Sequence, residues 1–111
     1  MNDIRIIDTH CHLDFNELKT RLDEVIKDAK INNVTDMVTI STNLSRIDTI
    51  KDISEEYQEV FFTVGVHPNE AHKDKQYDDD YFIENYSNHE KCVGIGEGGL
   101  DYFYNMDNMK L

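Results

Sequence analysis

The chain has 111 residues, of which 39% are apolar, and a formal net charge of −12. This length suits a single domain with a core of its own, and the composition is typical of a soluble globular protein. The acidic excess excludes a basic patch that would follow a nucleic-acid backbone, so bound cations would have to supply the positive field for a phosphate substrate.

The sequence also bears on the expected location of the protein. No segment has the pattern of a signal peptide, and no run approaches the roughly 18 apolar residues of a membrane span. Cys11 and Cys92 stand far apart and lack metal-finger spacing. We therefore expect a cytoplasmic protein with two free thiols and no membrane partner.

The first predicted elements are a strand and a helix. Residues 4–8 are short and rich in isoleucine, which predicts a strand. Asp14 and Glu17 have the spacing of a capping box, which predicts that a helix begins there. An apolar stripe follows at helical spacing, at Leu18, Leu22, Val25, Ile26 and Ala29. Residues 32–33 are expected to end this helix, because asparagine tolerates the left-handed conformation.

A second strand, a second helix and a third strand come next. Residues 34–40 predict the strand, and the polar residues 41–43 are expected to cap the helix that follows. Five apolar residues indicate that helix: Leu44, Ile47, Ile50, Ile53 and Tyr57. Residues 60–66 are apolar on both faces, as in a buried parallel strand. Pro68 is expected to end this strand, because proline cannot donate a ladder hydrogen bond.

The last predicted elements are a short helix over residues 78–87 and a strand over residues 92–96. The order βαβαβαβ indicates an α/β fold with a parallel sheet covered by helices. A doubly wound sheet and a fragment of a (β/α)8 barrel are equally compatible with this order. Since a whole barrel needs about 250 residues, the second alternative means that about half of a barrel is present.

The strongest local signal for chemistry is the pair His10 and His12 after the first predicted strand. Residues two apart in an extended chain point to the same face, so both imidazoles can converge on one cation. Cys11 then points the other way and is expected to be a small buried apolar filler. Active sites of barrels lie at the C-terminal ends of strands, so we predict that both histidines bind metal. Inert surface histidines are the alternative.

Glu97 follows the fourth predicted strand, after Gly94 and Gly96. A carboxylate at this place can bridge two cations, bind one or act as a base, so Glu97 is a candidate metal ligand and catalytic residue. A helix cap or a surface glutamate is the alternative. Asp101, four residues on, could orient a ligating histidine or cap a turn, and both roles stay open.

His67 directly follows the third predicted strand, so three of the four predicted strands end in a titratable group. Such a coincidence at one end of a sheet favours a common site there. Asp8 shares the parity of the two metal-ligand candidates and is expected to have a structural role. His72 and His89 lie in polar stretches and are expected to face solvent.

Two other classes of site fit the sequence poorly. Residues 94–99 match the letters of a GxGxxG dinucleotide-binding turn. No apolar-periodic helix follows them, and no room remains for the acidic ribose-binding residue about 20 positions further on. No serine or cysteine has a base nearby that would make it a nucleophile.

Three segments together resemble the TatD family of metal-dependent deoxyribonucleases, which belongs to the amidohydrolase-like TIM-barrel hydrolases. They are IDTHCHLD at residues 7–14, TVGVHPNEAH at residues 63–72 and VGIGEGGLDYFY at residues 93–104. They occur in the order of the family and at its approximate spacing, and the third is the most discriminating. The resemblance implies that residues 1–111 are the N-terminal portion of a single (β/α)8 domain, with the barrel incomplete.

The resemblance also implies roles for individual residues. His10 and His12 match the first two metal ligands, and Glu97 matches the catalytic glutamate that bridges the metals. His67 matches a motif histidine of the pocket, and is therefore a candidate for catalysis and for binding the substrate or its phosphate. Two divalent cations, Mg²⁺, Mn²⁺ or Zn²⁺, would occupy a complete site. Two further histidines and an aspartate of the family have no counterpart in these 111 residues.

The function implied is hydrolysis of phosphodiester bonds, with DNA as the substrate, and we expect little or no activity from this chain alone. One alternative is another metal-dependent hydrolase on the same scaffold, acting on esters, amides or an aminoacyl-nucleic acid ester. Another is a non-catalytic half-barrel remnant. Because the first and fourth strands would have unpaired edges, self-association of the half-barrel is a further expectation.

Overall fold

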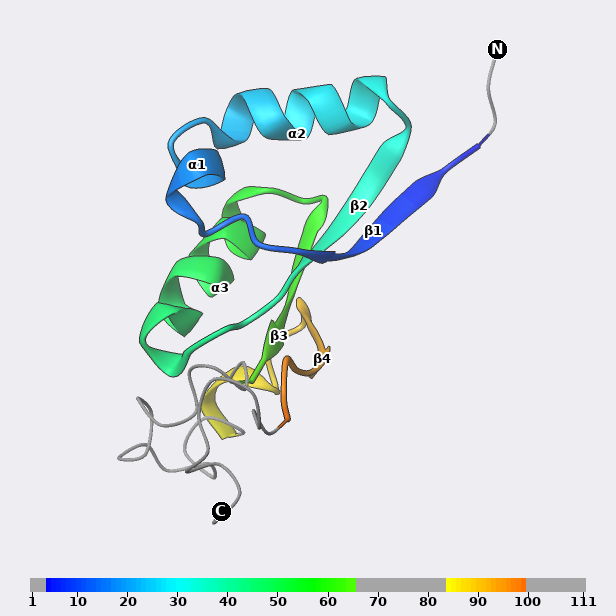
Figure 1. The fold of residues 1–111 in the computed structure, drawn as a ribbon. Helices are drawn as coiled ribbons and strands as arrows, with labels where there is room; N and C mark the ends of the chain where they lie inside the picture. Colours follow the sequence, from blue (N-terminus) through cyan, green and yellow to red (C-terminus); the bar gives the residue numbers. More distant parts are fainter. Residues whose placement is uncertain (1–3, 66–83, 100–111) are drawn as a thin grey trace.

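The computed structural model describes residues 4–65 and 84–99 (Figure 1). Its four strands form one sheet and are β1 (Ile6–Cys11), β2 (Val34–Thr39), β3 (Val60–Val64) and β4 (Cys92–Ile95). All neighbouring strands are parallel, and their order in the sheet is their order in the sequence. A doubly wound sheet reverses its strand order, whereas a barrel adds each strand on the same side. The topology therefore favours the barrel fragment.

Helices connect β1 to β2 and β2 to β3, and they cover one side of the sheet (Figure 1). Between β1 and β2 lie α1 (Asn16–Lys19) and α2 (Leu22–Ile31). Between β2 and β3 lie a 3-10 turn, η1 (Leu44–Arg46), and α3 (Ile47–Glu56). Helical crossovers of this kind let consecutive strands run parallel. The predicted helix over residues 78–87 lies largely outside the described residues.

The first helical connection differs from its prediction at the N-terminus. Phe15 precedes α1 and makes no side-chain cap hydrogen bond, so the predicted capping box is wrong. Asp14 is instead buried and paired with Arg46 of η1, with 2.9 Å between Nε and Oδ2. The predicted apolar stripe is confirmed, although it is split between α1 and α2. The end of α2 is also confirmed, because Asn33 adopts the left-handed conformation with φ 68°.

The second helical connection shows a similar difference. The polar residues 41–43 form no side-chain cap at Asn43, so this predicted cap is wrong as well. The Ser41 hydroxyl donates to the carbonyl oxygen of Gly65, across the sheet rather than into the helix. Four of the five predicted apolar positions of this segment are confirmed as buried, at Leu44, Ile47, Ile50 and Ile53. The fifth, Tyr57, follows the end of α3 and is half-buried.

Two apolar clusters fill the space between the sheet and the helices. One contains Leu44, Ile47, Ile50, Phe62, Val64 and Tyr86. The other contains Leu13, Ile26, Met37, Ile53 and Val60. β3 contributes to both, and its residues Val60, Phe62 and Val64 are each at most 4% exposed. β3 is therefore the buried strand that the sequence predicts, although it ends at Val64 rather than at residue 66. Burial of such side chains stabilises a fold by about 1.5–3 kcal/mol each.

The strand boundaries and edges place the candidate site. β1 extends to Cys11 rather than ending at residue 8, so His10 lies inside the strand and His12 directly after it. β1 and β4 are the outer strands of the described sheet, as the sequence predicts. Both expose large apolar side chains, namely Ile6, Ile7, Val93 and Ile95. No helix within residues 4–65 and 84–99 is long and apolar enough to cross a membrane.

Candidate metal centre

Side chains from β1 and from the end of β4 meet at one place. Candidate ligand atoms of His10, His12 and Glu97 all lie within 4.8 Å of one another. His10 Nε2 and Glu97 Oε2 are 3.4 Å apart. Donors bound about 2.1 Å from a zinc ion in tetrahedral geometry are themselves about 3–4 Å apart, so the three residues fit a shared cation with small adjustments.

This meeting depends on the curvature of the sheet. β1 and β4 are separated by β2 and β3, and in a flat sheet three strand spacings would put them about 14 Å apart. The short distance between His10 and Glu97 therefore requires that both side chains lean toward the same interior from a curved sheet. The inner mouth of a barrel has this geometry.

The ring of His12 is held in one orientation. Its Nδ1 lies 3.3 Å from the carbonyl oxygen of Ile40, which can only accept, so Nδ1 is the donor of this hydrogen bond. In the neutral form of the ring, Nε2 is then the nitrogen left to bind a metal. One face of the ring stacks on Phe15, with 4.7 Å between centroids and 10° between planes. The Arg46 guanidinium lies 5.6 Å from the centroid of the Phe15 ring. Because Asp14 binds Arg46, this buried carboxylate is connected to His12 through Arg46 and Phe15.

His10 and Glu97 are positioned mainly through their backbones. The His10 side chain is 55% exposed and that of Glu97 is 25% exposed. The His10 N–H donates to Asp8 Oδ1 at 3.0 Å, which gives Asp8 the structural role expected of it. The Glu97 N–H donates to the carbonyl oxygen of Ser41 at 3.1 Å, so the end of β4 is tied to the segment after β2.

Three residues that the sequence did not assign to the site, Ser41, Thr63 and Gly65, contact the backbone that carries Glu97. The Thr63 hydroxyl donates to the Gly96 carbonyl oxygen at 2.6 Å, and the Ser41 N–H donates to the same hydroxyl at 3.2 Å. A Cβ at Gly65 would lie 2.4 Å from the Gly96 carbonyl carbon, so the approach of these two backbones requires glycine. In the sequence these residues look like ordinary strand and turn residues.

Cys11 lies between the two histidines but does not join them. Its Sγ is 3.4 Å from the carbonyl oxygen of Val38, and the side chain packs against the cluster that contains Leu13. Burial, followed by the charges of Asp8 and Asp14, raises the pKa of Cys11 to about 12. A thiol of this kind is neutral at pH 7, which suits the predicted apolar filler.

The remaining predicted residues fall elsewhere. His67, His72 and Asp101 lie outside the described residues, so the roles predicted for them stay predictions. The expectation that His89 faces solvent is wrong. Its side chain is only 22% exposed, its Nε2 lies 3.2 Å from Glu55 Oε1, and its ring packs edge-on against Phe62. His89 therefore belongs to the helical side of the sheet.

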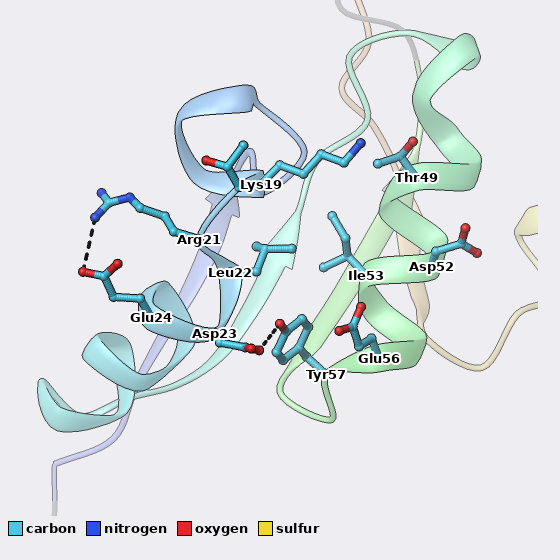
Figure 2. Close-up of a pocket in the computed structure, with 11 residues that line it drawn as sticks. Lys19, Arg21, Leu22, Asp23, Glu24, Thr49, Asp52, Ile53, Glu56 and Tyr57 are labelled. Atoms are coloured by element: carbon cyan, nitrogen blue, oxygen red, sulfur yellow. Dashed lines mark hydrogen bonds and ion pairs between the residues drawn. The ribbon is translucent and has the colours of Figure 1, made fainter.

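A separate pocket of about 660 Å³ lies between the first helical segment and α3 (Figure 2). Its lining includes the apolar Leu22 and Ile53 together with several charged side chains. Figure 2 shows Tyr57 donating a hydrogen bond to Asp23, and Arg21 paired with Glu24. None of the three candidate ligands lines this pocket, so it is distinct from the candidate metal centre.

Comparison with known proteins points to one family. Residues 7–110 match the family described as TatD related DNase. An uncharacterized metal-dependent hydrolase of Buchnera aphidicola subsp. Baizongia pistaciae is 35% identical over 109 residues, which cover 96% of this chain and 40% of that protein. The metal-dependent hydrolase YabD of Bacillus subtilis is 37% identical over 99 residues, which cover 89% of this chain and 38% of YabD.

A solved structure supports the same fold. The crystal structure of YJJV, a TatD homologue from Escherichia coli K12, matches with a TM-score of 0.78 and 26% identity. The match covers 95% of this chain and 40% of YJJV, so the described sheet and helices correspond to part of a TIM barrel. This chain also spans about 40% of the length of the curated relatives. The match over nearly all of its residues shows that the chain belongs to the TatD-related DNase family.

Proposed function

We propose that this chain supplies the N-terminal part of a hydrolase metal centre, with His10, His12 and Glu97 as ligands of a divalent cation. The observation that carries the proposal is that these three side chains converge from β1 and β4, the two outer strands of the described sheet, and from the residues just after them. Two imidazoles and a carboxylate suit Zn²⁺ or Mn²⁺, and further oxygen donors would suit Mg²⁺. The names of the relatives as metal-dependent hydrolases support this class of reaction.

DNA is the proposed substrate, and a phosphodiester is the bond that would be hydrolysed. The description of the matched family supports this choice. When bound, divalent cations polarise a phosphoryl oxygen and lower the pKa of a bound water, and they would supply positive charge at the phosphate in a chain whose net charge is −12. Within this chain, Glu97 is proposed to bridge two cations and to act in catalysis. His67 is proposed to face the phosphate and Asp101 to orient a ligating histidine.

The complete site requires ligands beyond those of this chain. We propose that residues 1–111 form the N-terminal portion of one barrel domain, and that the whole barrel is needed for turnover. The chain alone is therefore expected to show little or no nuclease activity. Its expected cytoplasmic location also stays a prediction.

The experiment that tests this function restores the rest of the barrel. We would join this chain to the part of YabD that follows the matched region and assay nicking of supercoiled plasmid with Mg²⁺ or Mn²⁺. The chimera should nick plasmid in a chelator-sensitive reaction. Its Glu97→Gln variant should be at least about 100-fold slower, which corresponds to about 2.7 kcal/mol of transition-state stabilisation.

Glu90→Gln is the matched control, since Glu90 is exposed and not among the three candidate ligands. It should nick at the rate of the unmodified chimera. Near-normal nicking by the Glu97→Gln chimera would refute the assignment of Glu97. Hydrolysis of an ester or amide substrate without plasmid nicking would instead support another hydrolase on this scaffold.

A further inference from the structure

Hydrogen bonds to neighbouring strands hold the backbone at Gly96 and Glu97. The Gly96 N–H donates to the carbonyl oxygen of Val64 at 2.8 Å, and the Glu97 N–H donates to that of Ser41 at 3.1 Å. The Gly96 carbonyl oxygen accepts from the Thr63 hydroxyl at 2.6 Å. Hydrogen bonds with the ends of two other strands therefore fix the backbone of Gly96 and Glu97, and the Glu97 side chain is 25% exposed.

The side chain of Thr63 connects the other members of this arrangement. Its hydroxyl accepts from the Ser41 N–H and donates to the Gly96 carbonyl oxygen, so both of its hydrogen-bonding functions are in use. Thr63 is 8% exposed, and a buried polar group without partners would destabilise the fold. One hydroxyl thus links the segment after β2 to the segment after β4.

The position of Thr63 in its strand explains why it can reach this backbone. Its neighbours Phe62 and Val64 belong to the cluster between the sheet and the helices. Because side chains alternate along a strand, Thr63 points to the opposite face of the sheet. That face is the side toward which His10 and Glu97 lean.

We infer that Thr63 is a positioning residue for the candidate metal centre, and that its hydroxyl holds Glu97 at the place where its carboxylate can share a cation with His10 and His12. The inference rests on the proposed function. It predicts that loss of the hydroxyl lowers the affinity for metal more than loss of a comparable buried hydroxyl elsewhere. Residues that orient metal ligands typically change affinity by about 10- to 100-fold when they are replaced.

The test is a calorimetric titration of Mn²⁺ alone into the full chain and its variants. Thr63→Val keeps the shape of the side chain but removes the hydroxyl, and should weaken Mn²⁺ binding about tenfold or more. Thr63→Ser keeps the hydroxyl and should retain affinity within about twofold of the unmodified chain. Thr63→Ala removes the hydroxyl without placing a methyl group against the Gly96 carbonyl, and provides the same test if the valine variant does not fold.

Ser54→Ala is the matched control. The Ser54 hydroxyl is also buried, but it donates to the Lys51 carbonyl oxygen within α3. This variant should lose stability to urea and keep its affinity for Mn²⁺. Equal Mn²⁺ affinity in the unmodified, Thr63→Val and Thr63→Ala chains would overturn the positioning role and leave the metal centre standing. If the unmodified chain bound no Mn²⁺, the proposed centre itself would fail, and this inference with it.

Discussion

At the scale of single residues, the least expected feature is the ion pair between Asp14 and Arg46. Asp14 is 1% exposed, and its Oδ1 has no hydrogen-bond partner among the described residues. Arg46 binds the other carboxylate oxygen and also lies over Phe15, on which His12 stacks. The pair therefore links the stability of the fold to the orientation of a candidate ligand.

We predict that Arg46→Ala lowers the free energy of unfolding by about 3 kcal/mol, because it leaves the buried Asp14 carboxylate without its charged partner. Urea denaturation at pH 7 measures the change. Arg21→Ala is the control, since Arg21 and Glu24 form an exposed pair, and it should cost about 0.5 kcal/mol. Equal losses in the two variants would contradict a special role for the buried pair.

The residues of the candidate site divide into those that a sequence can reveal and those that it cannot. His10, His12 and Glu97 were predicted to meet because their residue types and places at strand ends are local signals. Asp14 was misassigned as a helix cap, since its partner Arg46 lies 32 residues away. Local spacing cannot show such a contact, because it joins the segment after β1 to η1.

At the scale of elements, the order of strands and helices can be predicted from hydrophobic periodicity. The close contacts between these elements cannot be predicted in this way. The apolar stripe of α2 and the buried residues of β3 follow from their spacing. The roles of Thr63 and Gly65 depend on the three-dimensional approach of the chain after β4. The ion pair between Lys30 in α2 and Glu59 just before β3 also depends on the three-dimensional approach of two segments far apart in the sequence.

The ion pair between Lys30 and Glu59 makes stability depend on pH. The Lys30 ammonium donates to the carboxylate and lowers the pKa of Glu59 below its usual value of 4.5. A carboxyl group with a lowered pKa in the folded state stabilises the fold above pH 4.5, and this contribution is lost as the pH falls through the folded-state pKa.

We therefore predict that Glu59→Gln is less stable than the unmodified chain by about 0.5–1 kcal/mol at pH 7. The difference should shrink to nothing as the pH falls below the folded-state pKa of Glu59. Urea denaturation over a series of pH values measures this difference in stability, with the exposed Glu90→Gln variant as the control. A difference that grew toward acid pH would contradict the sign expected from the ion pair.

At the scale of the whole molecule, the described sheet has two open edges. β1 and β4 expose Ile6, Ile7, Val93 and Ile95, and unpaired edges with apolar side chains favour association. The relatives are about two and a half times as long as the matched region, since that region covers about 40% of them. We propose that the part of such a longer chain beyond the matched region supplies the strands that complete the barrel.

For this chain, we predict self-association that light scattering detects as a mass above the 13.0 kDa of one copy. Pairing of two half-barrels would give a discrete dimer, whereas edge-to-edge contact would give a broad distribution. Ile7→Lys places a charge on the edge strand and should shift the protein toward the monomer. A monodisperse monomer of the unmodified chain at high concentration would contradict the prediction.

The central claim is that His10, His12 and Glu97 together bind a divalent cation, and a calorimetric titration with Mn²⁺ tests it most directly. The unmodified chain and Glu90→Gln should bind with equal affinity. His10→Ala, His12→Ala and Glu97→Gln should each weaken binding by about tenfold or more, because each removes one of three protein ligands. Binding that none of these three substitutions changes would contradict the claim.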